Sequence, residues 1–189
     1  MTAQDIRDEV DGWSAGRSWL WRAPILLGLG WIGVRHLADP LYDSVFGALN
    51  LGLHEAGHLL FSWLPGQFLT VAGGTLLQLA APVVAAVMFV RQPDYFAVPV
   101  CGAWLAMNLY NVAAYMADAR AQVLPLVTVG DGDCFVCHDW AYLLGTFGLL
   151  RFDTALAFLV RLLAFLLMWM SIAAGAWMLR RMAVERRPA

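Results

Sequence analysis

Long runs of apolar residues dominate the chain, and short polar segments separate them. A membrane-spanning helix needs about 20 mostly apolar residues to cross a hydrocarbon core of ~30 Å. The pattern predicts five such helices, at Trp19–Leu37, Ser44–Leu64, Phe68–Val90, Tyr95–Met116 and Thr154–Leu179. A sixth apolar stretch, Trp140–Leu150, is short for a full crossing and is expected to form a tilted short helix or a re-entrant segment. The expected fold is an all-α integral membrane bundle of five or six transmembrane helices.

The composition agrees with a membrane protein. Hydrophobic residues make up 61% of the chain and charged residues 14%, with a mean hydropathy of +0.65. A soluble globular domain is nearer half apolar and a quarter charged. The formal net charge is −2, so no basic surface indicates nucleic acid as a partner. We expect a short polar segment at 1–18, one polytopic transmembrane domain in the lipid bilayer at 19–179, and a basic tail at 180–189.

The charges near the two ends bear on orientation. The C-terminal stretch LRRMAVERRPA carries four arginines, and positive residues close to a span favour the cytoplasmic side. The N-terminal stretch MTAQDIRDEVDGW is acidic, unlike the basic start of a secretory signal, so we expect no cleaved signal. With a cytoplasmic tail, six crossings place the N-terminus in the cytoplasm and five place it outside. We expect a bacterial inner-membrane protein, with its active site near the cytoplasmic side if Trp140–Leu150 crosses.

One apolar run contains three ionisable residues. Residues 51–64 read LGLHEAGHLLFSWL, in which HEAGH matches the pattern H-E-x-x-H. Residues four apart share a helix face, so His54 and His58 can present imidazole nitrogens to one zinc ion. Glu55 can then act as general base toward a water that zinc activates. An ionisable residue at the centre of a membrane helix costs about 2.5–3.5 kcal/mol, so metal binding explains these residues better than two interior histidines beside a stray glutamate.

The histidine pair leaves one ligand to find, because a catalytic zinc usually has three protein ligands. The fourth predicted span ends with four polar residues spaced three, four and three apart, namely Asn108, Asn111, Tyr115 and Asp118. At about 100° per residue they fall on one stripe, which should face protein or a wet cavity. Asp118 is the first candidate for the third ligand. Its alternative role is an interfacial carboxylate paired with Arg120.

His138 and Asp139 are the rival candidates. They open the stretch HDWAYLL after a connecting loop. An even number of crossings separates the ends of the second and fourth predicted spans, so these ends share a membrane side with that loop. Either residue can therefore reach the histidine pair as a metal ligand, or orient a ligating histidine through a hydrogen bond.

Cys134, Cys137 and His138 spell C-x-x-C-H, a pattern for c-type haem attachment. Haem needs an extracytoplasmic loop, a second axial ligand and a pocket, and the surrounding DGDCFVCHDW offers no obvious pocket. A structural zinc here would be one ligand short of four. A Cys134–Cys137 disulfide is the ordinary alternative if the loop is extracytoplasmic.

Two basic residues in apolar surroundings also need partners. Arg161 lies inside the last predicted span and should pair with a carboxylate, such as Asp118, Asp139 or Asp153, or face a polar cavity. His36 ends the first predicted span and is expected at the membrane interface rather than in a metal site.

Together, these motifs resemble the site-2 protease family of intramembrane zinc metalloproteases, which cut transmembrane helices of regulatory proteins. The resemblance covers about Ser44 to Asp118 and rests on HEAGH in a membrane helix, the following segment GGTLLQLAAP, and a later helix with asparagine and aspartate. It implies that His54 and His58 hold zinc and that Glu55 is the catalytic base.

The family's second motif is matched less closely. Asp118 corresponds to its aspartate, and Asn111 or Asn108 to the nearby asparagine that helps to hold the substrate backbone or the oxyanion. The family carries glycine after the aspartate, where this chain has Ala119. The resemblance implies that Asp118 is the third ligand.

The expected function is that of a zinc-dependent metallopeptidase, with Zn²⁺ as cofactor and a membrane-embedded peptide or protein as substrate. Two alternatives stay open. A non-proteolytic membrane zinc hydrolase would act on lipid or amide bonds and release products from lipids but not from peptides. A metal- or haem-binding membrane protein without hydrolase activity would keep its behaviour after Glu55→Gln.

Overall fold

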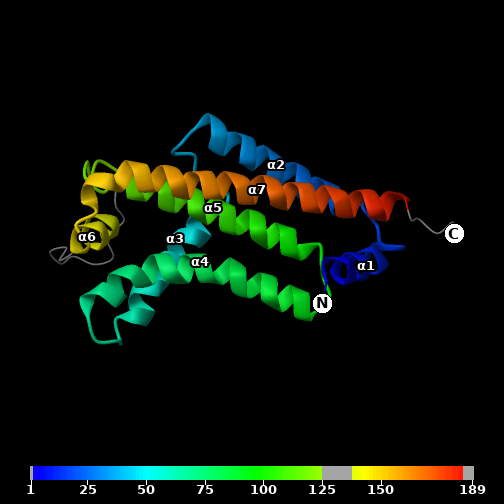
Figure 1. The fold of residues 1–189 in the computed structure, drawn as a ribbon, viewed down its shortest axis with the longest axis horizontal. Coiled ribbons are helices and arrows are strands. Elements are labelled where there is room, and N and C mark those ends of the chain that lie inside the picture. The colour runs from blue at the N-terminus through cyan, green and yellow to red at the C-terminus, as the bar shows by residue number, and fades with distance from the viewer. Residues whose placement is uncertain (1, 125–137, 185–189) are drawn as a thin grey trace.

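The computed structural model describes residues 2–124 and 138–184, and the regular elements within these ranges are all helical (Figure 1). In chain order they are α1 (Ala3–Ser14), α2 (Ala23–Ala38), α3 (Gly47–Phe61), α4 (Gln67–Arg91), α5 (Ala97–Ala117), α6 (Asp139–Thr146), the 3-10 helix η1 (Leu150–Phe152) and α7 (Asp153–Val184). The all-α prediction is confirmed for the described parts of the chain.

Within those parts, three helical stretches are long and apolar enough to cross a membrane. They are α4, α5 and the stretch 150–184 that contains η1 and α7, and they indicate a membrane protein. α2 has 16 residues and α3 has 15, so each rises only about 22–24 Å against a hydrocarbon core of ~30 Å. α6 has eight residues and is too short to cross. The count of five or six crossings is not confirmed and stays a prediction.

α5 is the central helix of the bundle. It packs along α7 on one side and against α4 on the other, while α3 packs against α4 and α2 against α7 (Figure 1). Small and medium side chains line the contact between α5 and α7, so the two backbones approach closely. Ala103, Ala106 and Met107 of α5 are fully buried there, together with Ala164 and Met168 of α7. This packing fixes the C-terminal half of α5 beside α3 and α6.

The two ends of the bundle carry different elements. At one end α1 packs against the C-terminal part of α7, where the Arg181 guanidinium donates two hydrogen bonds of 2.7 and 3.0 Å to the Asp11 carboxylate. At the other end α6 packs against α4 and α5 and precedes the start of α7. Both described chain ends therefore lie at the end opposite α6 (Figure 1).

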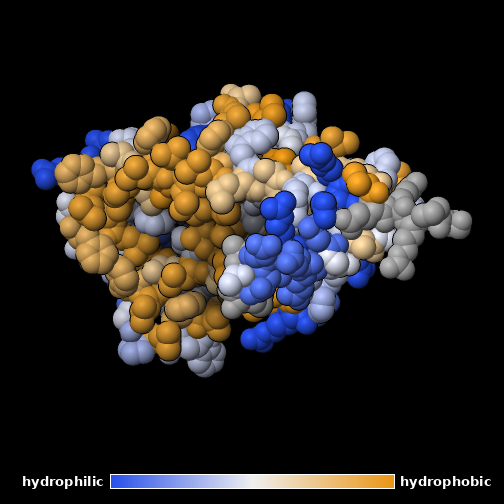
Figure 2. All heavy atoms as spheres, turned by 45° about the vertical axis from the view of Figure 1, so that its right-hand side comes forward, coloured by the Kyte–Doolittle hydropathy of each residue, from blue (hydrophilic) through white to orange (hydrophobic). Residues whose placement is uncertain are grey.

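The surface of the helices is strongly apolar. Figure 2 shows hydrophobic side chains over most of the visible face of the long helices, with hydrophilic ones gathered around α1. Many large apolar side chains are more than 40% exposed, among them Leu76, Val84, Phe158 and Leu166. Such a surface suits lipid rather than water as the surrounding medium.

α3 and α4 approach each other through glycine. A Cβ on Gly57 would overlap the carbonyl group of Gly73, and a Cβ on Gly73 would lie 2.7 Å from the Cβ of Phe61. The chain turns between the two helices at Gly66, whose φ of 105° is costly for residues with a side chain. This close contact holds the histidine face of α3 directly against the N-terminal half of α4.

Candidate metal centre

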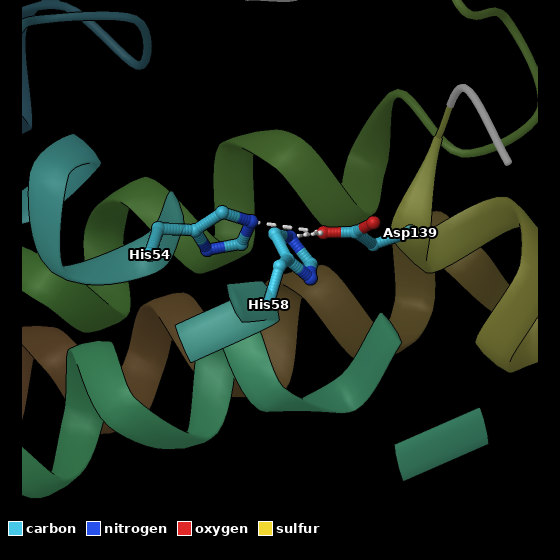
Figure 3. A group of neighbouring side chains, drawn as sticks. All are labelled: His54, His58 and Asp139. Carbon is cyan, nitrogen blue, oxygen red and sulfur yellow. Dashed lines mark hydrogen bonds and ion pairs between the residues drawn. The ribbon is translucent and has the colours of Figure 1, made fainter. Parts of the chain in front are cut away.

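Three side chains from two distant segments converge on one point (Figure 3). His54 and His58 lie one turn apart on α3, and Asp139 is the first residue of α6. One carboxylate oxygen of Asp139, Oδ2, lies 2.9 Å from His54 Nε2 and 3.2 Å from His58 Nε2. Within the described ranges, these three residues form the one cluster whose donor atoms all lie within 4.8 Å of one another.

The opposite nitrogen of each imidazole contacts an oxygen of α4. His54 Nδ1 lies 3.1 Å from Gln78 Oε1, and His58 Nδ1 lies 2.9 Å from the backbone carbonyl oxygen of Thr70. If a metal ion takes Nε2 as its donor atom, the Nδ1–H of each ring can donate to its α4 oxygen, which fixes the ring plane. Both rings are therefore oriented so that Nε2 faces the Asp139 carboxylate.

The cluster is largely shielded from solvent. The side chains of His54, His58 and Asp139 are 12%, 25% and 10% exposed. Burial alone would raise the pKa of the Asp139 carboxyl, but the hydrogen bonds with the two histidines outweigh it and hold that pKa below its ordinary value. Asp139 is therefore ionised at neutral pH, which is the form that binds a metal cation.

The start of α6 is fixed by its neighbours. His138 is the N-cap residue, and its Nδ1 accepts a hydrogen bond of 3.2 Å from the backbone N–H of Ala141. The backbone N–H of Asp139 donates to the Tyr115 hydroxyl at 3.1 Å. Burial lowers the pKa of His138, although the carboxylates of Asp118 and Asp139 oppose this shift. His138 thus lies next to the cluster as a capping residue and is not one of its three donors.

Asp118 lies outside the cluster. It caps the end of α5, where its two carboxylate oxygens accept hydrogen bonds of 3.0 Å from the backbone N–H groups of Val123 and Leu124. Its Oδ2 also lies 3.6 Å from His138 Nε2. Arg120, the partner considered for Asp118, instead binds Asp153 at 2.7 and 2.8 Å. Among the described residues, Asp139 therefore occupies the third position for which Asp118 was the first candidate.

The two asparagines named as catalytic candidates lie in different surroundings. Asn108 is completely buried and donates to the Trp104 carbonyl of its own helix at 3.1 Å. Asn111 is half-buried, and its Oδ1 accepts a hydrogen bond of 3.1 Å from Asn50 Nδ2. Asn50 is itself buried on α3, one turn before His54, and accepts a bond from Trp104 Nε1 at 2.8 Å. Asn111 is thus joined to the helix that carries the histidines, whereas Asn108 is not.

Asn50 and Gln78 are site neighbours that the sequence reasoning did not name. Asn50 stands four residues before His54 and therefore shares its helix face. Gln78 is a polar residue inside the apolar run of α4 and is only 6% exposed. A lone polar residue in such a run is a signal of a buried polar partner.

Glu55 is half-buried on α3 and follows the first histidine. It is close enough to His58 to interact with it electrostatically. In the described parts of the chain its carboxylate forms no hydrogen bond or ion pair, so both oxygens are available to accept a proton.

The residues fit a zinc ion by three criteria. Two imidazole nitrogens and one carboxylate oxygen are a donor set that zinc uses in catalytic sites, with a fourth position open. Each histidine has an oriented Nδ1, as ligating histidines do. Gly74 leaves space beneath the rings, because a Cβ there would lie 2.6 Å from His58 Nε2 and 2.8 Å from His54 Cε1.

The cysteines divide between described and undescribed parts of the chain. Cys134 and Cys137, with the haem and disulfide alternatives attached to them, lie outside the described residues. Cys101 is a free, buried cysteine on α5.

The comparisons with known proteins return nothing: no family model, curated protein or solved structure matches the chain. The fold and the convergent residues alone define the class, an all-helical membrane protein with a candidate His-His-Asp metal centre.

Gln78 provides a test of the histidine orientation. Replacing Gln78 with leucine removes the oxygen that contacts His54 Nδ1 and keeps a similar volume, so we expect zinc affinity to fall about 10–100-fold. Zinc titration of the purified full-length variant measures this. Gln92→Leu at the end of α4 is the matched control and should bind like the wild type. Unchanged affinity in the Gln78 variant would contradict the proposed role.

Proposed function

We propose that this protein is an intramembrane zinc metalloprotease that hydrolyses peptide bonds of membrane-embedded substrates. The observation that carries the proposal is the approach of His54 Nε2 and His58 Nε2 to one Asp139 oxygen, at 2.9 and 3.2 Å. These three residues would hold the zinc ion. The H-E-x-x-H spacing places a free carboxylate, Glu55, directly after the first of them.

Bound zinc would supply a Lewis acid that polarises the scissile carbonyl and makes a water molecule acidic near neutral pH. The chain's own groups account for the proton movements. Glu55 accepts a proton from the attacking water and returns it to the leaving amine. Asn111 can donate from its amide nitrogen to a substrate carbonyl, because its Oδ1 is the atom engaged by Asn50.

The surroundings favour a substrate that is itself in the membrane. The cluster lies among apolar helices, and its three side chains are at most 25% exposed. A peptide bond in an intact helix has its carbonyl engaged in a backbone hydrogen bond, so the substrate must unwind locally before attack. The likeness of HEAGH and its flanking segments to the site-2 protease family supports the same reaction, with Asp139 in the ligand role that the resemblance assigned to Asp118.

We further infer which membrane face lies near the centre. α7 begins beside α6 and ends beside α1, so a single crossing by α7 separates the centre from Arg180 and Arg181. If these arginines are cytoplasmic, the centre lies toward the opposite face. The expected cytoplasmic position depended on a crossing by Trp140–Leu150, and α6 is too short to provide it.

The test is metal content combined with cleavage. Purified full-length protein should hold about one zinc per chain and cleave a transmembrane peptide in detergent or nanodiscs. Removing the metal with a chelator should abolish cleavage, and added Zn²⁺ should restore it. Cleavage that survives complete metal removal, or lipid products without peptide products, would overturn the proposal.

A further inference from the structure

A cavity lies away from the candidate metal centre. It has a volume of about 400 Å³ and is bounded by the end of α2, the middle of α5 and the first turns of α7. Its walls are mostly apolar, and three polar or charged groups line it. These groups are His36 of α2, Tyr110 of α5 and Arg161 of α7.

Arg161 carries a charge that no carboxylate in the described chain neutralises. Its guanidinium donates to the backbone carbonyl of His36 at 3.3 Å and lies 5.7 Å from the Tyr110 ring. The carboxylates that the sequence suggested as partners are engaged elsewhere: Asp153 by Arg120, Asp118 by two backbone N–H groups, and Asp139 by the histidines. Asp39, near His36, accepts from the backbone N–H of Leu41.

His36 and Tyr110 add buried polar atoms without partners. The expected position of His36 at the membrane interface stays a prediction; the residue is 1% exposed and stacks on Tyr110, with ring centroids 4.4 Å apart. Both imidazole nitrogens of His36 and the hydroxyl of Tyr110 lack hydrogen-bond partners among the described residues. A buried polar group without a partner costs free energy. A phosphate oxygen that reached these groups would accept a hydrogen bond from the Tyr110 hydroxyl and from the one N–H of a neutral His36.

The position of Arg161 along α7 matches the headgroup level of a bilayer. The next charged residue on the helix is Arg180, and the 18 residues between them, 162–179, are all uncharged. At 1.5 Å per residue this stretch spans about 27 Å, close to the thickness of the hydrocarbon core. Arg161 therefore lies near the boundary of the leaflet at the end of the bundle that holds α6.

The apolar walls of the cavity face outward. Leu162 is 44% exposed and Phe165 is 36% exposed, and both lie in the stretch 162–179 that matches the hydrocarbon core. A small soluble anion would gain nothing from these side chains, whereas an acyl chain would cover them. A ligand with a charged head and an apolar tail satisfies both parts of the cavity.

We propose that this cavity binds an anionic phospholipid, with its phosphate on Arg161 and an acyl chain along Leu162 and Phe165. The guanidinium forms charge-assisted hydrogen bonds to the phosphate oxygens. His36 and Tyr110 provide further donors beside it. The site is separate from the zinc centre and does not depend on the proposed protease activity.

The experiment titrates the full-length protein in detergent micelles with phosphatidylglycerol and, separately, with phosphatidylcholine, and follows bound lipid by native mass spectrometry. We expect phosphatidylglycerol to bind at least about tenfold more tightly than phosphatidylcholine. Arg161→Gln should reduce phosphatidylglycerol affinity by about tenfold or more and remove the preference. Arg151→Gln is the matched control, because Arg151 is exposed at the same end of the bundle and does not line the cavity.

A second variant keeps the test decisive if Arg161→Gln fails to fold. Leu162→Trp narrows the cavity from its exposed rim without removing a charge, and it should also weaken phosphatidylglycerol binding. Equal affinity for the two lipids, or wild-type affinity in both variants, would overturn the proposal. Displacement of the lipid by millimolar inorganic phosphate would also overturn it, because the site would then recognise a soluble anion.

Discussion

Replacing Glu55 with glutamine is expected to abolish peptide hydrolysis while the protein keeps its zinc. Glutamine has nearly the same shape but cannot accept a proton from water at neutral pH. General acid–base catalysis typically contributes about 10²–10⁴-fold to the rate, so we expect kcat to fall by that amount. The zinc content should not change, because Glu55 is not among the three converging donors.

The measurement compares single-turnover cleavage of a transmembrane peptide and zinc stoichiometry in the same preparations. Glu9→Gln is the matched control, since Glu9 lies on α1 at the far end of the bundle and bonds to Tyr95. Loss of zinc in the Glu55 variant would show that this residue supports the metal rather than the proton transfer. Undiminished cleavage would remove Glu55 from the mechanism altogether.

Asp139→Asn is expected to reduce zinc affinity by more than about 100-fold, because it removes the charged donor on which both histidines converge. Loss of an orienting partner alone typically costs about 10–100-fold, and loss of a ligand should cost more. Asp118→Asn should keep zinc affinity within a few-fold of the wild type, because Asp118 binds backbone N–H groups of the turn after α5.

Zinc titration of the two variants separates these roles. Thermal unfolding of each should accompany it, since Asp118→Asn weakens a turn and is expected to lower stability without affecting the metal. The reverse pattern, in which Asp118→Asn loses zinc and Asp139→Asn retains it, would show that Asp118 is the third ligand. It would contradict the assignment of Asp139 from the arrangement in Figure 3.

The apolar runs of the sequence predict α4 and α5 to within two residues at each end, and they predict α7 up to Leu179, beyond which the helix continues to Val184. The prediction is poorer for α3. The apolar run extends to Leu64, but the helix ends at Phe61, and Trp63 and Leu64 lie in the turn toward Gly66. Hydropathy measures preference for lipid and not the backbone hydrogen bonds that define a helix end, so it cannot locate such a boundary.

For the candidate site, the sequence predicts residues that are close along the chain better than a residue that is far along it. The four-residue spacing of His54 and His58 identifies them because a helix converts that spacing directly into proximity. Asp139 is 81 residues beyond His58, and its position depends on how α6 packs against α4 and α5. The polar stripe on α5 indicated Asp118 as the third ligand. The periodicity could not show that the Asp118 carboxylate accepts hydrogen bonds from backbone N–H groups of the turn that follows α5.

The orientation of the two imidazoles in the candidate metal centre depends on the distance between α3 and α4, which the glycine contact sets. The two imidazoles project from α3, and the oxygens that orient them, Gln78 Oε1 and the Thr70 carbonyl, belong to α4. Anything that separates the two backbones therefore withdraws both oxygens at once and loosens both rings. By thermodynamic reciprocity, a cation that binds the ordered rings strengthens the pairing of the two helices. Because Gly57 and Gly73 allow the close approach of α3 and α4, they couple the distance between these two helices to metal binding at the candidate site.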